Sequence, residues 1–421
     1  MKHQKMQYTY VGIDSHKDTH TAVFMDCFFE KLGEIVFDNL PYKFSDFLSQ
    51  AKKLEQDGTT LLFGLEDVSV YGRQLTVFLT ENNQPTKHVN AYLVAQERKS
   101  LSITQKTDSV DAECAARVLL SKLNELPDAN PINKYWILRT LVVRRDFLIK
   151  NNVSLKYYLH DLLFAHFPRY GDVFVDPFCK TALAFFMRFP SPPALKGVTA
   201  EELFELIRGY SSNRIAFEKA EEILSIAAEG NFTGVEFQEV RDTIVQSAIR
   251  QMQTNLAEIE SVEDSMAGFL EKFNCTLTSM TGIDVVRAAQ LLSCIGDIKK
   301  FSTPAKLARY CGVAPVTYSS GKTEIQYANK RGNRELNSLF FCLAAFLVTT
   351  SIGGKATNPF FYDYYHKKQA EGKTKRQALK CIQRRLVNII WTMLTNNEEY
   401  VNPPMIERLP EEKTEQTDVK H

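Results

Sequence analysis

The sequence lacks the features that mark several large classes of protein. Its 421 residues include no run of eighteen uncharged apolar residues, so we expect no membrane span and no membrane partner. Residues 1–10 are polar and lack the apolar core of a signal peptide. The eight cysteines are scattered and form no CxxC pair, which fits a reducing cytoplasm and excludes a disulfide scaffold and a zinc ribbon.

Net charge is nearly absent as well, at +1, but it is unevenly distributed. Residues 276–392 contain 18 Lys and Arg against 6 Asp and Glu, a local net charge of +12. That leaves 33 of the 51 basic and 44 of the 50 acidic residues elsewhere, a net charge of −11. A basic segment on an acidic body favours a polyanionic partner, although a solvated surface of lysine and arginine explains the charge equally well.

The first 125 residues show an α/β pattern. Three β-rich runs predict strands close enough for antiparallel hairpins, at 8–13, 19–26 and 33–38. A helix at 41–56 and a buried strand at 61–65 are predicted next. A helix at 71–80, a short strand at 86–89 and a helix from 108 onward follow. This order is that of the ribonuclease H fold, whose mixed five-stranded sheet places the first and fourth strands side by side and parallel.

The middle of the chain is helical, and the C-terminal part is predicted to be mainly α. Residues 131–167 and 236–273 carry apolar side chains at helical spacing. In 236–273 the spacings average close to a heptad, which predicts a coiled coil or a self-association surface. A long helix packed on its own domain explains the same pattern.

Four carboxylates stand where such a fold places its site. Asp14 ends the first strand and Glu66 follows the fourth, and open α/β sheets bind ligands at the carboxyl ends of their strands. Asp108 and Asp111 are three residues apart at the start of a helix, so both can point the same way. Clustered carboxylates repel one another unless cations neutralise them, and Mg²⁺ takes oxygen ligands. The joint pattern predicts a metal site.

Each acidic residue also has an ordinary structural explanation. An Asp after a strand is usually a turn former. Asp108 could be the N-cap of its helix, and Asp111 could complement the helix dipole. Asp67 follows Glu66 directly, so either could be the inward residue. Only the combination favours metal binding.

His16 and His20 are four residues apart, as in some zinc sites. Their segment reads as a turn that leads into a strand and lacks the Glu of an HExxH motif, so we do not expect zinc there. Lys17, beside the predicted cluster, could contact phosphate or be a solvated turn residue.

Two blocks of the chain resemble the transposases of insertion-sequence family 110 (the 116/110/902 group). The N-terminal block resembles that family's DEDD domain, itself similar to the Holliday-junction resolvase RuvC, in VGIDSHKDTH (11–20), GLEDVSVYG (64–72) and KTDSVDAECAARVL (106–119). The C-terminal block resembles the family's second conserved block over 277–341, which includes VTYSSGKTEIQYANKRGNRELNSLFF. Both blocks occur here in the family's order and spacing.

The resemblance implies roles for individual residues. The family's four acidic ligands of Mg²⁺ or Mn²⁺ correspond to Asp14, Glu66, Asp108 and Asp111. The family's proposed nucleophile is the serine of an SG motif, which attacks a DNA phosphodiester and forms a phosphoserine link. The motif here reads YSSG, so we assign Ser320, with Ser319 as the alternative.

A basic stretch follows the SG motif. Its cations are Lys322, Lys330, Arg331 and Arg334. They could neutralise the non-bridging oxygens of a phosphoryl group during transfer. A lone SSG is usually an ordinary turn, and KRGNR could equally be a solvated loop.

With this resemblance the chain divides into four parts. Residues 1–128 form a RuvC-like, metal-dependent DEDD domain, and residues 129–274 a helical and coiled-coil-containing assembly region. Residues 275–398 form a mainly α transposase domain with the SG motif, and residues 399–421 a polar tail.

The implied function is a site-specific DNA recombinase that cleaves DNA and transfers an insertion sequence. The resemblance further implies guidance by a structured non-coding RNA, dimers that pair into tetramers, and a prokaryotic cytoplasmic location, associated with the nucleoid during activity. Two alternatives are a RuvC-like structure-specific endonuclease with a structural serine, and a non-catalytic nucleic-acid-binding protein. The four intact acidic positions argue against the latter.

Overall fold

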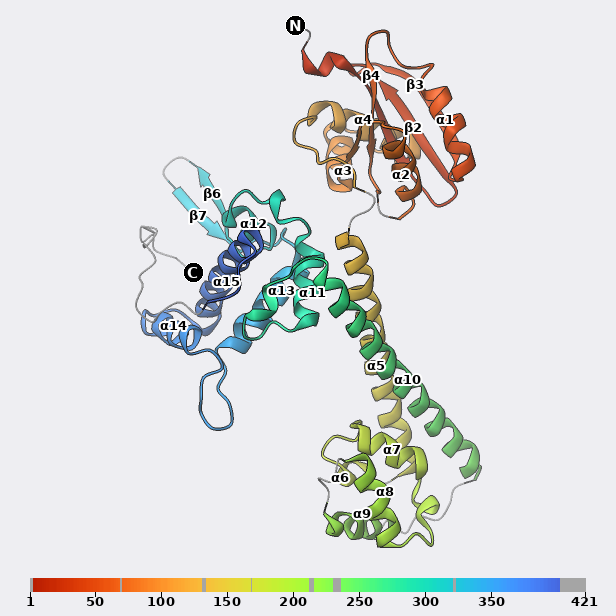
Figure 1. Cartoon of the computed structure of the whole chain (residues 1–421), viewed down its shortest axis with the longest axis vertical. Coiled ribbons are helices and arrows are strands. Elements are labelled where there is room, and N and C mark those ends of the chain that lie inside the picture. The colour runs from red at the N-terminus through yellow and green to blue at the C-terminus, as the bar shows by residue number, and fades with distance from the viewer. Residues whose placement is uncertain are drawn as a thin grey trace. The chain divides into compact units, whose positions relative to one another are not determined.

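The computed structural model describes residues 3–68, 70–130, 134–167, 169–211, 216–229, 236–320 and 323–401. They form two compact units, one that ends at Trp136 and one that begins at Ile137 (Figure 1). Among these residues, no helix combines the length and apolar composition that a membrane span requires.

The first unit is built on a mixed five-stranded sheet in the order β3-β2-β1-β4-β5. Its strands are β1 (Tyr8–Ser15), β2 (Thr19–Met25), β3 (Lys31–Asp38), β4 (Thr60–Leu65) and β5 (Thr86–His88). The first three strands pair antiparallel, while β4 runs parallel to both β1 and β5. The predicted parallel pairing of the first and fourth strands is therefore confirmed, with Ile13 beside Leu65.

Helices cover both faces of this sheet. They are α1 (Phe44–Ala51), α2 (Arg73–Glu81), α3 (Ala91–Ser100) and α4 (Asp108–Ser121), with short 3-10 turns η1 (Gln4–Gln7) and η2 (Pro41–Lys43). Buried side chains of α1 and α2 pack with Val11 and Ile13, and those of α3 and α4 pack with Tyr10. Because side chains alternate along a strand, Asp14 belongs to the face that α3 and α4 cover.

The structure differs from the sequence-based expectations at two places in this unit. The helix expected over 41–56 ends at Ala51, where the chain enters turns. Helix α3 was not predicted, and the structure places it between β5 and α4. Its segment AYLVAQERKS buries only Val94, so it carries almost no apolar stripe from which to predict a helix.

Two long helices of the second unit lie side by side and antiparallel, α5 (Lys134–His166) and α10 (Gln238–Glu271) (Figure 1). Nε of Arg145 is 2.6 Å from Oε1 of Glu263, and Nδ2 of Asn255 donates to Oδ1 of Asn152 at 3.0 Å. The elements between them are α6 (Tyr170–Val173), α7 (Lys180–Arg188), η3 (Pro192–Leu195), α8 (Ala200–Tyr210) and α9 (Phe217–Glu229). They enclose a phenylalanine-rich core with parts of α5 and α10.

The apolar seam predicted on α10 is partly buried and partly exposed. Ala248, Met252 and Met266 are buried within the chain, as a helix packed on its own domain would be. Phe237, at the N-cap, and Val240 are 70% and 59% exposed. The coiled coil and the self-association surface stay predictions.

The C-terminal part of the second unit is mainly α, as predicted. Its helices and 3-10 turns are η4 (Leu277–Ser279), α11 (Val285–Ile295), η5 (Ile298–Lys300), α12 (Pro304–Tyr310), α13 (Arg334–Leu347), α14 (Pro359–Ala370) and α15 (Lys375–Asn396). A hairpin that was not predicted, β6 (Val316–Ser320) and β7 (Thr323–Tyr327), interrupts them. The four-part division of the chain stays a prediction, and residues 402–421 of the expected tail lie outside the described part.

Candidate active site

The position of α4 depends on Gly12 in β1. A Cβ added at Gly12 would lie 2.1 Å from the Ala112 carbonyl oxygen and 2.2 Å from the Ala116 backbone nitrogen. Only glycine allows a strand and a helix backbone to approach this closely. Because Asp14 is two residues after Gly12, and Asp108 is one turn before Ala112, this contact brings the two carboxylates together.

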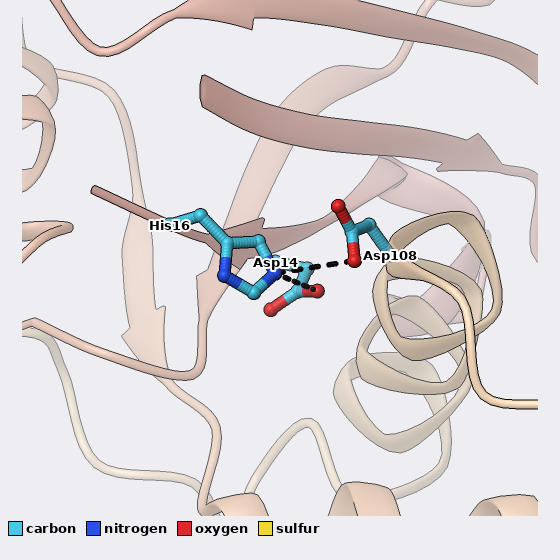
Figure 2. A group of neighbouring side chains, drawn as sticks. All are labelled: Asp14, His16 and Asp108. Carbon is cyan, nitrogen blue, oxygen red and sulfur yellow. Dashed lines mark hydrogen bonds and ion pairs between the residues drawn. The ribbon is translucent and has the colours of Figure 1, made fainter. Parts of the chain in front are cut away.

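Asp14, His16 and Asp108 converge on one point (Figure 2). Nε2 of His16 is 3.1 Å from Oδ2 of Asp14 and 3.2 Å from Oδ1 of Asp108. The Asp14 side chain is 12% exposed, whereas those of His16 and Asp108 are 51% and 56% exposed. The site therefore has a buried carboxylate at its base and an open side towards solvent.

Glu66 and Asp67, which are adjacent in the sequence, differ in their surroundings. The carboxylate of Asp67 accepts hydrogen bonds from the backbone nitrogens of Val70 at 2.9 Å and Tyr71 at 2.7 Å, so it stabilises the turn after β4. Burial raises the pKa of Glu66, and the charges of Asp14 and Asp111 raise it further. Glu66 thus shares an electrostatic environment with the other carboxylates.

Asp111 is buried and forms an ion pair with Arg98. Arg98 belongs to α3, so sequence analysis missed it together with its helix. The pair neutralises one carboxylate of the group and attaches α3 to the first turn of α4. The sequence signal was weak, because Arg98 stands among other polar residues near the end of α3.

Asp14, at the base of the site, lies among several other carboxylates. Burial raises the pKa of Asp14, and the carboxylates of Asp108 and Asp111 also raise it, while His16 lowers it. A carboxylate that is costly to ionise beside other carboxylates is stabilised by a cation. The donor set of Asp14, His16 and Asp108, with Glu66 near, fits a divalent ion.

The sequence pattern suggested His16 only as a partner of His20 in a zinc pair. His20 instead lies in β2, packed edge-on against Phe37, and burial lowers its pKa to about 4. A simpler signal was its closeness to Asp14 in the sequence. His16 stands two residues after Asp14 and directly follows the end of β1.

The serine and the downstream cations belong to the second unit. Ser320 ends β6 and pairs with Thr323 of β7, and Ser319 pairs with Glu324. Lys322 lies outside the described residues. Lys330, Arg331 and Arg334 are exposed, and we call them the basic loop.

Contacts between backbone and side chains fix the basic loop at its base. Nδ2 of Asn329 donates to the Arg309 carbonyl oxygen at 2.8 Å, and Nδ2 of Asn337 donates to the Gly312 carbonyl oxygen at 2.7 Å. A Cβ added at Gly332 would lie 2.3 Å from Cα of Gly312, so the two glycines pack backbone to backbone. The loop is therefore held in place while its charges face solvent.

Comparison with known families gives the chain its identity. Residues 11–168 match a family model for the DEDD transposase of IS110, described as a transposase. Residues 274–365 match the model described as the transposase IS116/IS110/IS902 family. The chain belongs to the IS116/IS110/IS902 family of transposases. This family acts on DNA, and its DEDD domain implies the use of divalent metal.

Relatives of the transposase come from several bacteria. It is 26% identical over 409 residues to the insertion element IS116 uncharacterized 44.8 kDa protein of Streptomyces clavuligerus, which covers 94% of this chain and 97% of the relative. It is 32% identical over 217 residues to the insertion element IS110 uncharacterized 43.6 kDa protein of Streptomyces coelicolor, 51% of each chain. It is 30% identical over 129 residues to the pilin gene-inverting protein of Moraxella bovis, 30% of this chain and 37% of the relative.

Proposed function

We propose that this transposase cleaves and rejoins DNA strands with a divalent ion, Mg²⁺ or Mn²⁺, at Asp14, Glu66, Asp108 and Asp111, and with Ser320 as the nucleophile. The observation that carries the proposal is the convergence of Asp14 and Asp108 beside the ends of β1 and β4. We call the four carboxylates the acidic cluster. A bound Mg²⁺ would supply Lewis-acid stabilisation to a phosphoryl oxygen.

The acidic cluster offers two kinds of carboxylate. Asp14 and Glu66 are half-buried or buried groups with raised pKa values, and Asp108 is exposed at the open side. Asp111 is paired with Arg98, which holds its carboxylate at the first turn of α4, so Asp111 would exchange this partner to bind the ion. Asp14 would therefore be the base of the metal site, and Asp108 would close it.

In the proposed chemical step, Oγ of Ser320 forms a bond to a DNA phosphorus as the bond from that phosphorus to a deoxyribose oxygen breaks. The serine proton passes to a base and the leaving oxygen takes up a proton. Attack on the phosphoserine by a deoxyribose hydroxyl of another strand then joins that strand and releases the serine. The segment 316–324 contains no histidine, so the activation must come from elsewhere. We assign it to the acidic cluster of the same or another protomer.

The basic loop and Lys322 are proposed to hold the DNA backbone. Arginine and lysine contact phosphate with charge-assisted hydrogen bonds. The exposure of the loop's cations and its fixed base support this role. Exposed Tyr318 and Tyr327 on the adjoining hairpin, with ring centroids 5.6 Å apart, also suit contact with nucleic acid.

We further infer a guide RNA and an assembly of dimers that pair into tetramers. The family resemblance supports both. Self-association also has structural support, because α5 exposes large apolar side chains on the side away from its buried residues, namely Val143, Phe147, Tyr157 and Phe164. Phe164 is 80% exposed. A stripe of large apolar side chains on an exposed helix face is typical of a surface that packs against another protein chain.

The test of the function is to trap a covalent intermediate. Incubation with its nucleic-acid substrates and Mg²⁺, followed by denaturation, should give a protein–DNA adduct whose phosphopeptide maps to Ser320. Ser320→Ala should still bind nucleic acid and metal but give no adduct and no recombined product. Ser319→Ala is the matched control and should keep substantial activity.

Other outcomes select the alternatives. A link at Ser319 or at a tyrosine would overturn the assignment of the nucleophile. Cleaved DNA with a free end and no attached protein would indicate a resolvase-like endonuclease, in which water attacks. Binding without cleavage would indicate a non-catalytic nucleic-acid-binding protein.

A further inference from the structure

A nitrogen atom lies within the acidic cluster, where the family resemblance assigns only carboxylates. Nε2 of His16 is 3.1 Å from Oδ2 of Asp14 and 3.2 Å from Oδ1 of Asp108 (Figure 2). We propose that His16 is a third ligand of the divalent ion, together with Asp14 and Asp108, and that it biases the site towards Mn²⁺ over Mg²⁺. This inference rests on the proposed function, since it assumes that Asp14 and Asp108 hold the ion.

The spacing of the three donors suits a shared ion. An imidazole carries at most one hydrogen on Nε2, so it cannot donate a full hydrogen bond to two carboxylates at once. In an octahedral complex with bonds of about 2.1 Å, neighbouring ligand atoms are about 3.0 Å apart. Both observed separations, 3.1 Å and 3.2 Å, are close to this edge length. All three donor atoms lie within 4.8 Å of one another.

Backbone contacts fix the turn that carries His16. Its backbone nitrogen donates to the Thr19 carbonyl oxygen at 3.1 Å. Nδ2 of Asn39 donates to the carbonyl oxygens of His16 at 3.1 Å and Lys17 at 3.2 Å. The turn therefore keeps the imidazole beside the carboxylates, which lowers the cost of assembling a donor set.

A nitrogen ligand changes which ion the site prefers. Carboxylate oxygens and water suit Mg²⁺ and Mn²⁺ alike, whereas imidazole is a better ligand for transition metals than for Mg²⁺. An oxygen-only cluster would discriminate little between the two ions. With His16 as a ligand, removal of the imidazole should weaken Mn²⁺ binding more than Mg²⁺ binding.

The test uses full-length protein with Mn²⁺ alone, so its readout does not depend on activity. Pulsed electron paramagnetic resonance of the bound Mn²⁺ should show coupling to ¹⁴N in the wild type, which ¹⁵N-histidine labelling converts to ¹⁵N coupling. The coupling should vanish in His16→Ala. Calorimetry should show that His16→Ala loses Mn²⁺ affinity by about tenfold or more, and Mg²⁺ affinity by less. Tenfold is the smallest loss typical of removing a residue that only hydrogen-bonds to a metal ligand, so removal of a ligand itself should cost at least as much.

His3→Ala is the matched control. His3 is exposed and precedes β1, so it lies at the opposite end of that strand from Asp14. This variant removes one histidine from the same unit and should keep both the nitrogen coupling and the affinities.

The failures are distinguishable. Mn²⁺ that binds the wild type, is lost in Asp14→Ala, and shows no nitrogen coupling would overturn the His16 assignment and leave the proposed metal site intact. Equal losses of Mn²⁺ and Mg²⁺ affinity in His16→Ala would overturn the proposed metal preference. Mn²⁺ binding that does not depend on Asp14 would overturn both the inference and the metal site beneath it.

Discussion

The acidic cluster is assembled inside one packed unit, whereas Ser320 and the basic loop stand on a two-stranded hairpin and an exposed loop. Asp14 is held by strand register, by the Gly12 contact and by burial. The hairpin has two strands, and a lone pair of strands is marginally stable in water. The cluster can therefore be preorganised by the fold, whereas the proposed nucleophile stands on an element with little packing of its own.

This difference has a physical reason. Clustered carboxylates repel one another, so only a rigid scaffold keeps them close before an ion binds. Exposed cations need no such support, because solvent screens them until phosphate arrives. Changes in the first unit should thus alter stability and metal binding together, whereas changes in the basic loop should alter nucleic-acid binding and leave stability unchanged.

The largest effect is expected at Gly12. Gly12→Ala places a Cβ 2.1 Å from a backbone oxygen of α4, so the helix must move or the unit must unfold. We expect a loss of at least about 3 kcal/mol of stability and of Mn²⁺ binding, measured by urea unfolding and calorimetry. Gly209→Ala, in α8 with nothing within 4 Å, is the control and should be neutral or slightly stabilising. Normal metal binding in Gly12→Ala would break the link between packing and site.

Next in size is the effect of Asp14. Asp14→Asn should reduce strand transfer by at least about 100-fold. This is the largest loss typical of removing a residue that hydrogen-bonds to a metal ligand, and Asp14 is proposed to be a ligand itself. In EDTA near neutral pH the same variant should be more stable than the wild type, because burial and neighbouring carboxylates raise the pKa of Asp14 and so penalise its charged form.

The pH dependence has a definite sign. A carboxyl whose folded pKa is raised favours folding when protonated, and this contribution is lost as pH rises through the folded pKa. The stability gained by Asp14→Asn should therefore shrink as pH falls through the raised folded pKa of Asp14, and it should be lost below the unfolded pKa of aspartate, about 3.9. Thermal unfolding in EDTA at several pH values measures this. A destabilised variant at neutral pH would show that the carboxylate is stabilising without metal.

A smaller effect is expected from Arg98. Arg98→Ala leaves the buried Asp111 carboxylate without its cation, which should cost roughly 2 kcal/mol. Arg117→Ala is a matched control, since Arg117 pairs within α4 with Glu113, whose side chain is 27% exposed against 9% for Asp111, and it should cost less than about 1 kcal/mol. Urea unfolding in EDTA compares the two. Equal costs would mean that burial of Asp111 does not matter.

How much the sequence could predict also differs between the two regions. In the first unit, period-2 strands and their order predicted the sheet, and with it the neighbouring positions of Asp14 and Glu66. The sequence could not predict Arg98, because α3 has almost no buried face, or the contact of Gly12 with α4, which depends on a tertiary distance. His16 directly follows the end of β1, two residues after Asp14, but it was interpreted only together with His20.

In the second unit, the long helices α5 and α10 were predicted from their apolar periodicity. The β6–β7 hairpin was missed, because its ten strand residues are mostly polar and flank a glycine that also suits a simple turn. The role of Ser320 came from the family motif alone. No local pattern of residues around it identifies a nucleophile, since the segment 316–324 contains no histidine that could act as its base.

The smallest effect is expected in the basic loop, and it tests the other side of the comparison. Lys330→Ala and Arg331→Ala should leave stability unchanged, since both side chains are exposed, and the loop's base is fixed by Asn329 and Asn337 instead. Each variant should weaken binding to all nucleic-acid sequences alike and reduce the slope of log K against log salt by about 1, as loss of one phosphate contact predicts. Fluorescence anisotropy at several salt concentrations measures the slope.

Lys196→Ala, far from the loop in sequence and exposed, is a charge-matched control and should leave the slope unchanged. A change in sequence preference at constant slope would show that the loop reads bases. Loss of stability in Lys330→Ala would show that the second region, like the first, uses its charges to hold the fold.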